Sequence, residues 1–144
     1  ANDFGKKVVM GATTSIQQKF PITVQYNQKL RDLSMETYVD VWGVHYYSSS
    51  YESVVTQNGV EDTLNSLNVP VWITESGQQG PNKQLAYVET AWPFLLEKIP
   101  SIERFYYYEF GSTVPVDQNY GLRTTDSALP VSDLYVHLRT RAGN

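Results

Sequence analysis

The hydrophobic and polar positions of the chain repeat one order four times: an apolar stretch of strand length, a polar turn, and a stretch with helical spacing. The four apolar stretches predict strands at residues 6–15, 38–48, 69–75 and 102–111. Strands that are apolar on both faces and alternate with helices are typical of a parallel sheet covered by helices. The sequence therefore predicts an α/β fold of four β-α units with parallel strands, with residues 1–144 as a single region.

Four helices are predicted from apolar residues that recur on one face. The first is expected at about 26–36 and the last at about 132–139. The faces expected for the first three helices are Tyr26, Leu30 and Leu33, then Val60, Leu64 and Leu67, then Leu85, Val88, Trp92, Leu95, Leu96 and Ile99. Pro93 lies inside the third pattern and is expected to kink or break that helix, because proline has no amide hydrogen to donate.

Two architectures fit this order of elements. A flavodoxin-like open sheet normally offers a glycine-rich phosphate loop after its first strand, and "GATTS" at residues 11–15 is a weak match to one. The other is half of a TIM (β/α)8 barrel, since a complete barrel takes about 250 residues. A loop of roughly 20 residues after the fourth predicted strand is expected to be functional.

Composition narrows the class of protein and its partners. The chain has 144 residues, of which 41% are hydrophobic and 18% charged, as in a globular domain. Its net charge is -4 and no basic cluster stands out, so we expect no nucleic-acid partner and no membrane partner. It has no cysteine, and its 11 tyrosines would suit an aromatic binding cleft.

The stretch "VPVWITESG" at residues 69–77 is a buried strand that ends on an acid, Glu75. A carboxylate near a core is costly unless it is paired, so its position calls for a role or a partner. Strict alternation gives Glu75 the face of Val71 and Ile73, and gives His45 and Tyr47 one face of the preceding strand. We therefore expect these three polar groups to converge at the carboxyl ends of the two strands, where a tyrosine hydroxyl would orient a nucleophilic carboxylate.

At these residues the chain resembles the clan A retaining glycoside hydrolases, which are (β/α)8 barrels. "WITESG" is similar to the segment that carries their nucleophilic glutamate at the end of strand seven, and His45-Tyr46-Tyr47 to the His-x-Tyr that ends strand six. "FYYYEFG" at 105–111 is similar to their aromatic strand eight. Gly121, Leu122, Pro130 and Tyr135 match the segment before their last helix. The resemblance implies the C-terminal half of such a barrel, from strand five onward.

The resemblance also implies roles for single residues. Glu75 would be the nucleophile, Tyr47 would hydrogen-bond it, and His45 would position the sugar or the acid. Candidate sugar contacts are Tyr107, Tyr108 and Trp72. The acid/base glutamate of the family follows an asparagine at the end of strand four, and this chain contains no Asn-Glu pair. Retaining hydrolysis needs two carboxylates roughly 5 Å apart, so one of the pair is expected to come from elsewhere.

Three functions remain open. The first is hydrolysis of a β-linked oligo- or polysaccharide by double displacement, with this chain as the nucleophile half. The second is a non-catalytic carbohydrate-binding or scaffold half barrel, and the third is an unrelated flavodoxin-like domain. In the first two, the expected partner is an N-terminal half barrel or another copy of the chain. No metal or cofactor is expected, and the resemblance implies a secreted or extracytoplasmic protein.

Overall fold

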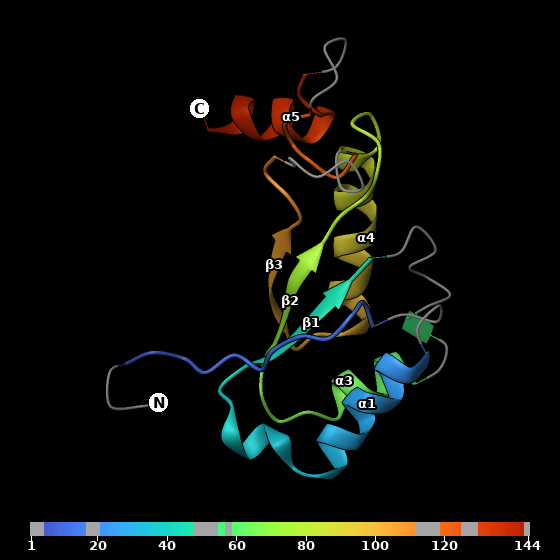
Figure 1. The fold of residues 1–144 in the computed structure, drawn as a ribbon, viewed down its shortest axis with the longest axis vertical. Helices are drawn as coiled ribbons and strands as arrows, with labels where there is room; N and C mark the ends of the chain where they lie inside the picture. Colours follow the sequence, from blue (N-terminus) through green and yellow to red (C-terminus); the bar gives the residue numbers. More distant parts are fainter. Residues whose placement is uncertain are drawn as a thin grey trace. The chain divides into compact units, whose positions relative to one another are not determined.

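The computed structural model describes residues 5–16, 21–47, 55–56, 59–111, 119–124 and 130–142 (Figure 1). Strands alternate with helices along this part of the chain, which confirms the α/β class. The elements, in order, are α1 (Pro21–Asp32), the 3-10 helix η2 (Met35–Tyr38), β1 (Trp42–Tyr46), α3 (Val60–Asn65), β2 (Val71–Ser76), α4 (Gln84–Lys98), β3 (Ile102–Tyr107) and α5 (Asp133–Arg141).

The chain divides into two compact units, which we describe separately. The sheet unit comprises Ala1–Ser76 and Phe94–Tyr106, and the α5 unit comprises Gly77–Pro93 and Tyr107–Asn144. The sheet unit holds the strands and the principal hydrophobic core. The α5 unit holds the segment that follows β2, the first part of α4, and α5 itself.

The sheet has the order β1-β2-β3, and β1 and β2 run parallel. This confirms the predicted parallel sheet with helical connections, an arrangement consistent with part of a (β/α)8 barrel. Three of the predicted strands are present in shortened form. The long loop predicted after the strand at 102–111 lies largely outside the described residues. Of this loop, the structure describes residues 119–124 and 130–131.

The predicted strand at 6–15 is wrong as a full strand. Val9 forms a single parallel bridge with Val41, where the amide of Met10 donates to the carbonyl of Val41 over 2.9 Å. The segment meets β1 again only where the amide of Ile16 donates to the carbonyl of His45, also over 2.9 Å. The segment therefore covers the outer edge of β1 at two places, without the continuous ladder that defines a strand.

The core of the sheet unit lies on one face of the sheet. Alternate residues of the strands point into it, namely Trp42, Val44 and Tyr46 from β1 and Val71 and Ile73 from β2. They are joined there by side chains from the helices and loops, including Val24, Leu64, Leu95 and Ile99. Burial of this apolar surface is the main force that holds the helices on the sheet.

The inner face of α1 differs from the predicted one. Tyr26 is 48% exposed, whereas Val24 and Asn27 are buried. Asn27 is accommodated in the core because its Oδ1 accepts from the indole nitrogen of Trp42 at 3.0 Å and its Nδ2 donates to the carbonyl of Thr23 at 2.9 Å. A polar residue with both groups satisfied can occupy a core position, which a pattern of apolar residues does not reveal.

Helix α4 continues through Pro93 to Lys98, so of the predicted kink or break the break does not occur. A proline inside a helix removes one backbone hydrogen bond, and burial of neighbouring side chains can outweigh that loss. The buried positions of α4 are Gln84, Tyr87, Ala91 and Leu95, whereas Leu96, which we expected on the inner face, is 45% exposed. The predicted inner face of α4 is therefore wrong in part: Leu95 is buried as expected, but the buried face also includes the polar residue Gln84 and excludes Leu96.

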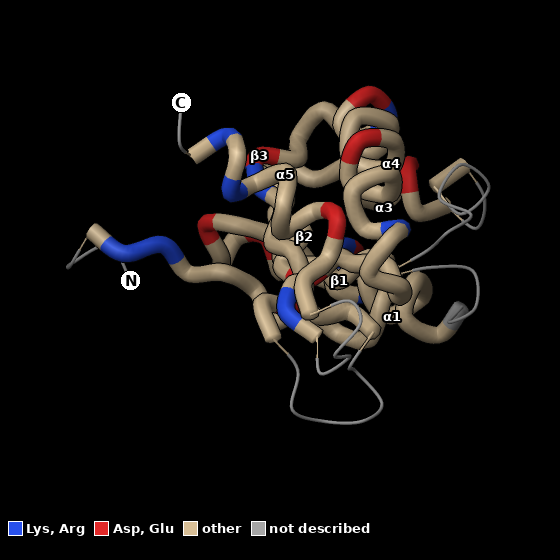
Figure 2. The backbone as a smooth tube through the Cα atoms, turned by 90° about the horizontal axis from the view of Figure 1, so that it is seen from above, with Lys and Arg blue, Asp and Glu red and all other residues tan. Residues whose placement is uncertain are grey.

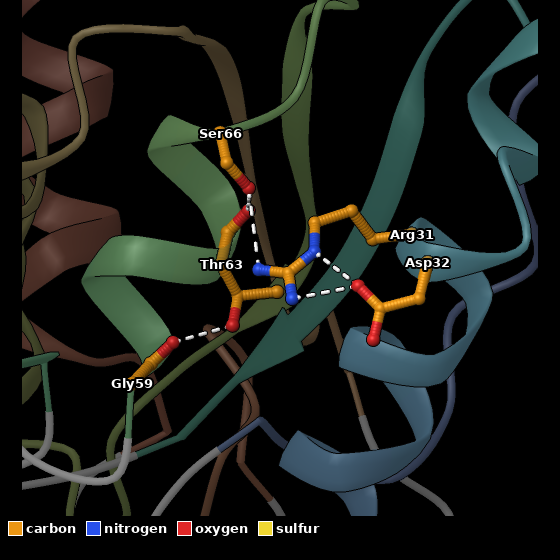
Figure 3. A network of polar contacts seen from close by, with 5 residues as sticks. All are labelled: Arg31, Asp32, Gly59, Thr63 and Ser66. Carbon is orange, nitrogen blue, oxygen red and sulfur yellow. Dashed lines mark hydrogen bonds and ion pairs between the residues drawn. The ribbon is translucent and has the colours of Figure 1, made fainter.

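Polar contacts connect α1 with α3 on the outer side of the sheet unit (Figure 3). The guanidinium of Arg31 forms an ion pair with Asp32 at 2.8 Å and donates to Ser66 Oγ at 3.3 Å. Within α3, Ser66 and Thr63 each donate to a backbone carbonyl one turn earlier. These bonds satisfy polar groups near the ends of the two short helices.

In the α5 unit, two side chains fasten segments that are distant in sequence. The amide nitrogen of Gln84, which is fully buried, lies 3.1–3.3 Å from the carbonyl oxygens of residues 119–121. Asp133 Oδ1 accepts from the amide of Leu85 at 3.0 Å and so caps the first turn of α4. Helix α5 begins at Asp133 behind the cap residue Ser132, close to the predicted 132–139.

Candidate active site

Three polar side chains meet at the carboxyl ends of β1 and β2. The hydroxyl of Tyr47 donates to Glu75 Oε2 over 2.9 Å, and His45 Nδ1 lies 3.3 Å from the same oxygen. His45 and Glu75 are direct partners in the register of the two parallel strands. The structure thus brings together the three residues that the sequence singled out, at the end of the sheet where we expected them.

The route by which Glu75 reaches this cluster differs from the prediction. Strict alternation assigns Glu75 the face of Val71 and Ile73, but that face packs against the helices. The register shifts between Val44 and His45, so that Val44 pairs with Ile73 while His45 pairs with Glu75. The predicted parity is therefore wrong, and one additional residue of β2 turns Glu75 to the opposite face.

Backbone contacts fix the other side of the cluster. The amide of Tyr47 donates to Ser15 Oγ at 2.8 Å, and Ser15 itself is buried. The bond from Ile16 to the carbonyl of His45 lies beside it. Ser15 was missed by the sequence analysis, although its place at the end of the first predicted strand puts it at the same end of the sheet.

The two oxygens of Glu75 have different surroundings. Oε2 receives both the tyrosine hydroxyl and the histidine nitrogen, whereas Oε1 makes no hydrogen bond with any residue that the structure describes. The side chain of Glu75 is 37% exposed and that of His45 25%. The carboxylate is held on Oε2 by a charge-assisted hydrogen bond from Tyr47.

Trp72 lies on the same strand as Glu75, but its ring is surrounded by other side chains. The guanidinium of Arg104 is 4.9 Å and Lys7 Nζ 5.7 Å from the ring centroid, both within the range of a cation–π interaction. The indole nitrogen donates to Glu103 at 3.2 Å, and Tyr106 is tilted against the ring. A sugar would reach this indole only if some of these contacts were displaced.

Tyr107 and Tyr108 belong to the α5 unit. The Tyr107 hydroxyl lies 3.4 Å from the carbonyl oxygen of Gln78, to which it donates, and burial raises the pKa of Tyr107 well above its usual range. Tyr108 meets the ring of Tyr120 edge-on, with centroids 6.1 Å apart. A side chain at Gly77 would overlap the carbonyl of Tyr108, so a glycine is required where these two segments approach.

Other kinds of site find no support in the described part of the chain. No group of three or more His, Asp or Glu side chains there could hold a metal ion. None of the helices in the described ranges has the length and apolar character to cross a bilayer. Figure 2 shows Lys and Arg in several elements of the described chain.

Comparison with models of known protein families gives a match. Residues 2–129 match the model of a family described as "Glycosyl hydrolase catalytic core", which covers well over half of the chain. A comparison with curated protein sequences gave no match. The matched range includes both strands that carry the Tyr47–Glu75 pair and the aromatic strand β3. The chain therefore belongs to the glycosyl hydrolase catalytic core family.

Proposed function

We propose that this chain supplies the nucleophile half of a retaining β-glycosidase, with Glu75 as the nucleophile. One observation carries the proposal: Glu75 Oε2 is held by Tyr47 and His45 while Oε1 has no partner among the described residues. A nucleophile needs this combination of a fixed carboxylate and one oxygen free to attack. The family membership supports hydrolysis of glycosidic bonds as the general activity.

In the proposed reaction, Glu75 Oε1 attacks the anomeric carbon of a β-linked sugar. The bond from that carbon to the leaving-group oxygen breaks, and a covalent glycosyl-enzyme forms. A second carboxylic acid protonates the leaving oxygen and then, as a base, takes a proton from the water that releases the sugar. Tyr47 holds Glu75 in place through both steps, and His45 positions the sugar or the second acid.

The second carboxylate is proposed to come from another polypeptide segment. In retaining enzymes the two carboxyl groups are about 5–5.5 Å apart, and this chain lacks the Asn-Glu pair that carries the second carboxylate in the family it resembles. An N-terminal half barrel or another copy of the chain would provide the missing group. Either partner would also cover the face of the sheet opposite the helices, as parallel sheets require.

Sugar contacts are proposed for Tyr107, Tyr108 and Trp72. The tyrosines follow from the aromatic strand that the family resemblance assigns to the substrate cleft. Trp72 shares the strand of Glu75, and its ring would have to exchange Arg104 or Lys7 for a sugar face. Aromatic rings suit this role because they present a large apolar face with a polar edge.

The nucleophile can be tested without the second carboxylate. A dinitrophenyl fluoro-glycoside, in which fluorine replaces the hydroxyl next to the anomeric carbon, has a leaving group that needs no protonation. Incubation of the chain with β-gluco, β-manno and β-xylo forms should add one sugar to the peptide that contains Glu75, as measured by mass spectrometry. Glu75→Gln should abolish this labelling, whereas Glu89→Gln, at an exposed position of α4, should label like the parent.

A second function, that of a non-catalytic carbohydrate-binding or scaffold half barrel, is favoured by the missing second carboxylate. The two proposals differ in this experiment. Oligosaccharide binding without labelling by any of the three reagents would support the scaffold and remove Glu75 as a nucleophile. Labelling at another carboxylate that persists in Glu75→Gln would contradict the residue assignment while leaving the reaction class in place.

A further inference from the structure

The register between β1 and β2 contains one additional residue immediately before Glu75. Val44 pairs with Ile73 and His45 pairs with Glu75, so three residues of β2 lie opposite two of β1. The additional residue is Thr74, and the arrangement has the residue count of a β-bulge. Bulges bend a strand locally and redirect the side chains that follow them, and they are frequent next to active sites.

The bulge determines which side of the sheet receives the acid. Ile73, two residues before Glu75, is fully buried on the helix side of the sheet. In a regular strand, Glu75 would point to that same side, where an unpaired carboxylate is strongly unfavourable. With the additional residue, Glu75 instead lies against His45 and accepts from Tyr47.

The hydroxyl of Thr74 bonds directly across the bulge. Thr74 Oγ1 donates to the carbonyl oxygen of Val44 over 3.1 Å, from β2 to β1 at the register shift. Backbone groups that lose their ladder partner at a bulge need another one. A threonine supplies that partner from the additional residue itself, because its hydroxyl is only one carbon away from the backbone.

We propose that Thr74 is a positioning residue for Glu75: its hydroxyl holds the bulge that directs the carboxylate to Tyr47 and His45. The consequence for the reaction rests on the proposed function of Glu75 as nucleophile. The effect of Thr74 on the position of the Glu75 side chain does not rest on that function, since it concerns only whether Glu75 contacts His45 and Tyr47. The two parts can therefore be measured separately.

Two substitutions separate the hydroxyl from the shape of the side chain. Thr74→Val keeps the branched shape and removes the donor, whereas Thr74→Ser keeps the donor and removes the methyl group. Thr37→Val is the matched control, because the Thr37 hydroxyl also donates to a carbonyl, that of Ser34 at 2.9 Å, at an exposed place in η2. Thr74→Ala serves as a second variant without the donor should the valine variant not fold.

The geometry is measured by NMR through His45. The chain has two histidines, so His137→Gln assigns the His45 ring signals. In the parent, Glu75→Gln should shift the His45 ring signals, because the two side chains are in contact. When Glu75→Gln is added to Thr74→Val, the His45 ring signals should not shift. When it is added to Thr74→Ser or to Thr37→Val, the His45 ring signals should shift as they do in the parent. Circular dichroism establishes that each variant is folded.

The reaction is measured by the rate of labelling with the fluoro-glycoside. Loss of one positioning hydrogen bond should slow labelling of Thr74→Val about tenfold, while Thr74→Ser stays within roughly threefold of the parent. A normal His45 response in Thr74→Val or Thr74→Ala would overturn the proposal, and so would a lost response with an unchanged labelling rate. If the parent is not labelled at all, the proposed function fails, and the His45 signals still decide whether Thr74 directs Glu75.

Discussion

Tyr47 and Glu75 are joined across neighbouring strands by a hydrogen bond of 2.9 Å between a neutral hydroxyl and a carboxylate oxygen. Hydrogen bonds to charged groups contribute about 1.5–3 kcal/mol. Tyr47→Phe removes the donor and keeps the ring, so it should slow labelling of Glu75 roughly 10- to 100-fold without unfolding the chain.

The control for that substitution is Tyr38→Phe. Tyr38 is 75% exposed and lies in η2, away from the strand ends. The labelling rate and the melting temperature of Tyr38→Phe should equal those of the parent. A Tyr47→Phe rate within twofold of the parent would show that Glu75 does not depend on this hydroxyl.

A second prediction concerns close approach between backbones. A side chain at Gly43 in β1 would overlap the carbonyl oxygen of Met10, whereas a Cβ at Gly11 would meet no described atom within 4 Å. Gly43→Ala should therefore destabilise the chain by about 1–3 kcal/mol, and Gly11→Ala should leave the stability nearly unchanged or slightly raised. Urea unfolding followed by circular dichroism measures both, and equal midpoints would contradict the packing of residues 8–10 against β1.

The third prediction is a dependence of stability on pH. Both the backbone amide and the side-chain amide of Asn68 donate to the carboxylate of Glu36, at 2.9 and 2.8 Å, and these bonds lower the pKa of Glu36 from its ordinary value of 4.5. Because the folded-state pKa is the lower one, the stabilising contribution is fully present above pH 4.5 and is lost as pH falls below it.

The pair is close to solvent, so its contribution should be less than about 1 kcal/mol. Glu36→Gln should be less stable than the parent at pH 7, and this difference should shrink below pH 4.5. Thermal melts of the parent and of Glu36→Gln, at pH 7 and at values below pH 4.5, measure this difference in stability. Glu89→Gln, at an exposed position, is the control. A difference that stays constant across this range would contradict the lowered pKa.

The fourth prediction concerns the buried amide of Gln84. Its nitrogen is within hydrogen-bonding distance of three carbonyl oxygens at residues 119–121, and the amide of Gly80 donates to the first of these at 2.9 Å. Gln84→Met keeps the length of the side chain and removes the donors, so the 119–121 turn should loosen at a cost of about 1–3 kcal/mol.

Hydrogen exchange at the Gly80 amide reports this loosening directly. Exchange should accelerate at least several-fold in Gln84→Met and remain as in the parent in Gln79→Met, since Gln79 is exposed in the same loop. Unchanged exchange in Gln84→Met would mean that the turn is held by other contacts.

The strands and the location of the cluster were predictable from the sequence for simple physical reasons. Short apolar runs flanked by turn residues favour buried strands, and β1, β2 and β3 lie within a few residues of the predicted bounds. Parallel strands also end at the same edge of a sheet. The sequence therefore predicts that Glu75 and His45 lie at the same end of the sheet, and the register shift then places them on the same face.

Features that depend on polar groups were not predictable in this way. Asn27 and Gln84 occupy core positions where partners distant in sequence bond them: Asn27 Oδ1 accepts from Trp42, and the Gln84 nitrogen donates to carbonyls at residues 119–121. The additional residue Thr74 shifts the register, and a count of alternating positions cannot detect it. Residues 6–15 have the composition of a strand, yet Val9 forms an isolated bridge with Val41 and no continuous ladder with β1 follows.

The register shift in β2 also changes how relatives of this chain should be sought. Ile73 is the last core residue of the strand, and the acid follows it by two positions, the spacing that in a regular strand would belong to a second core residue. Deleting Thr74, the one residue between them, would leave the apolar positions up to Ile73 unchanged and remove the shift. In a genome survey, an aligned glutamate therefore identifies a functional counterpart of Glu75 only if the residue before it can also sustain the shift.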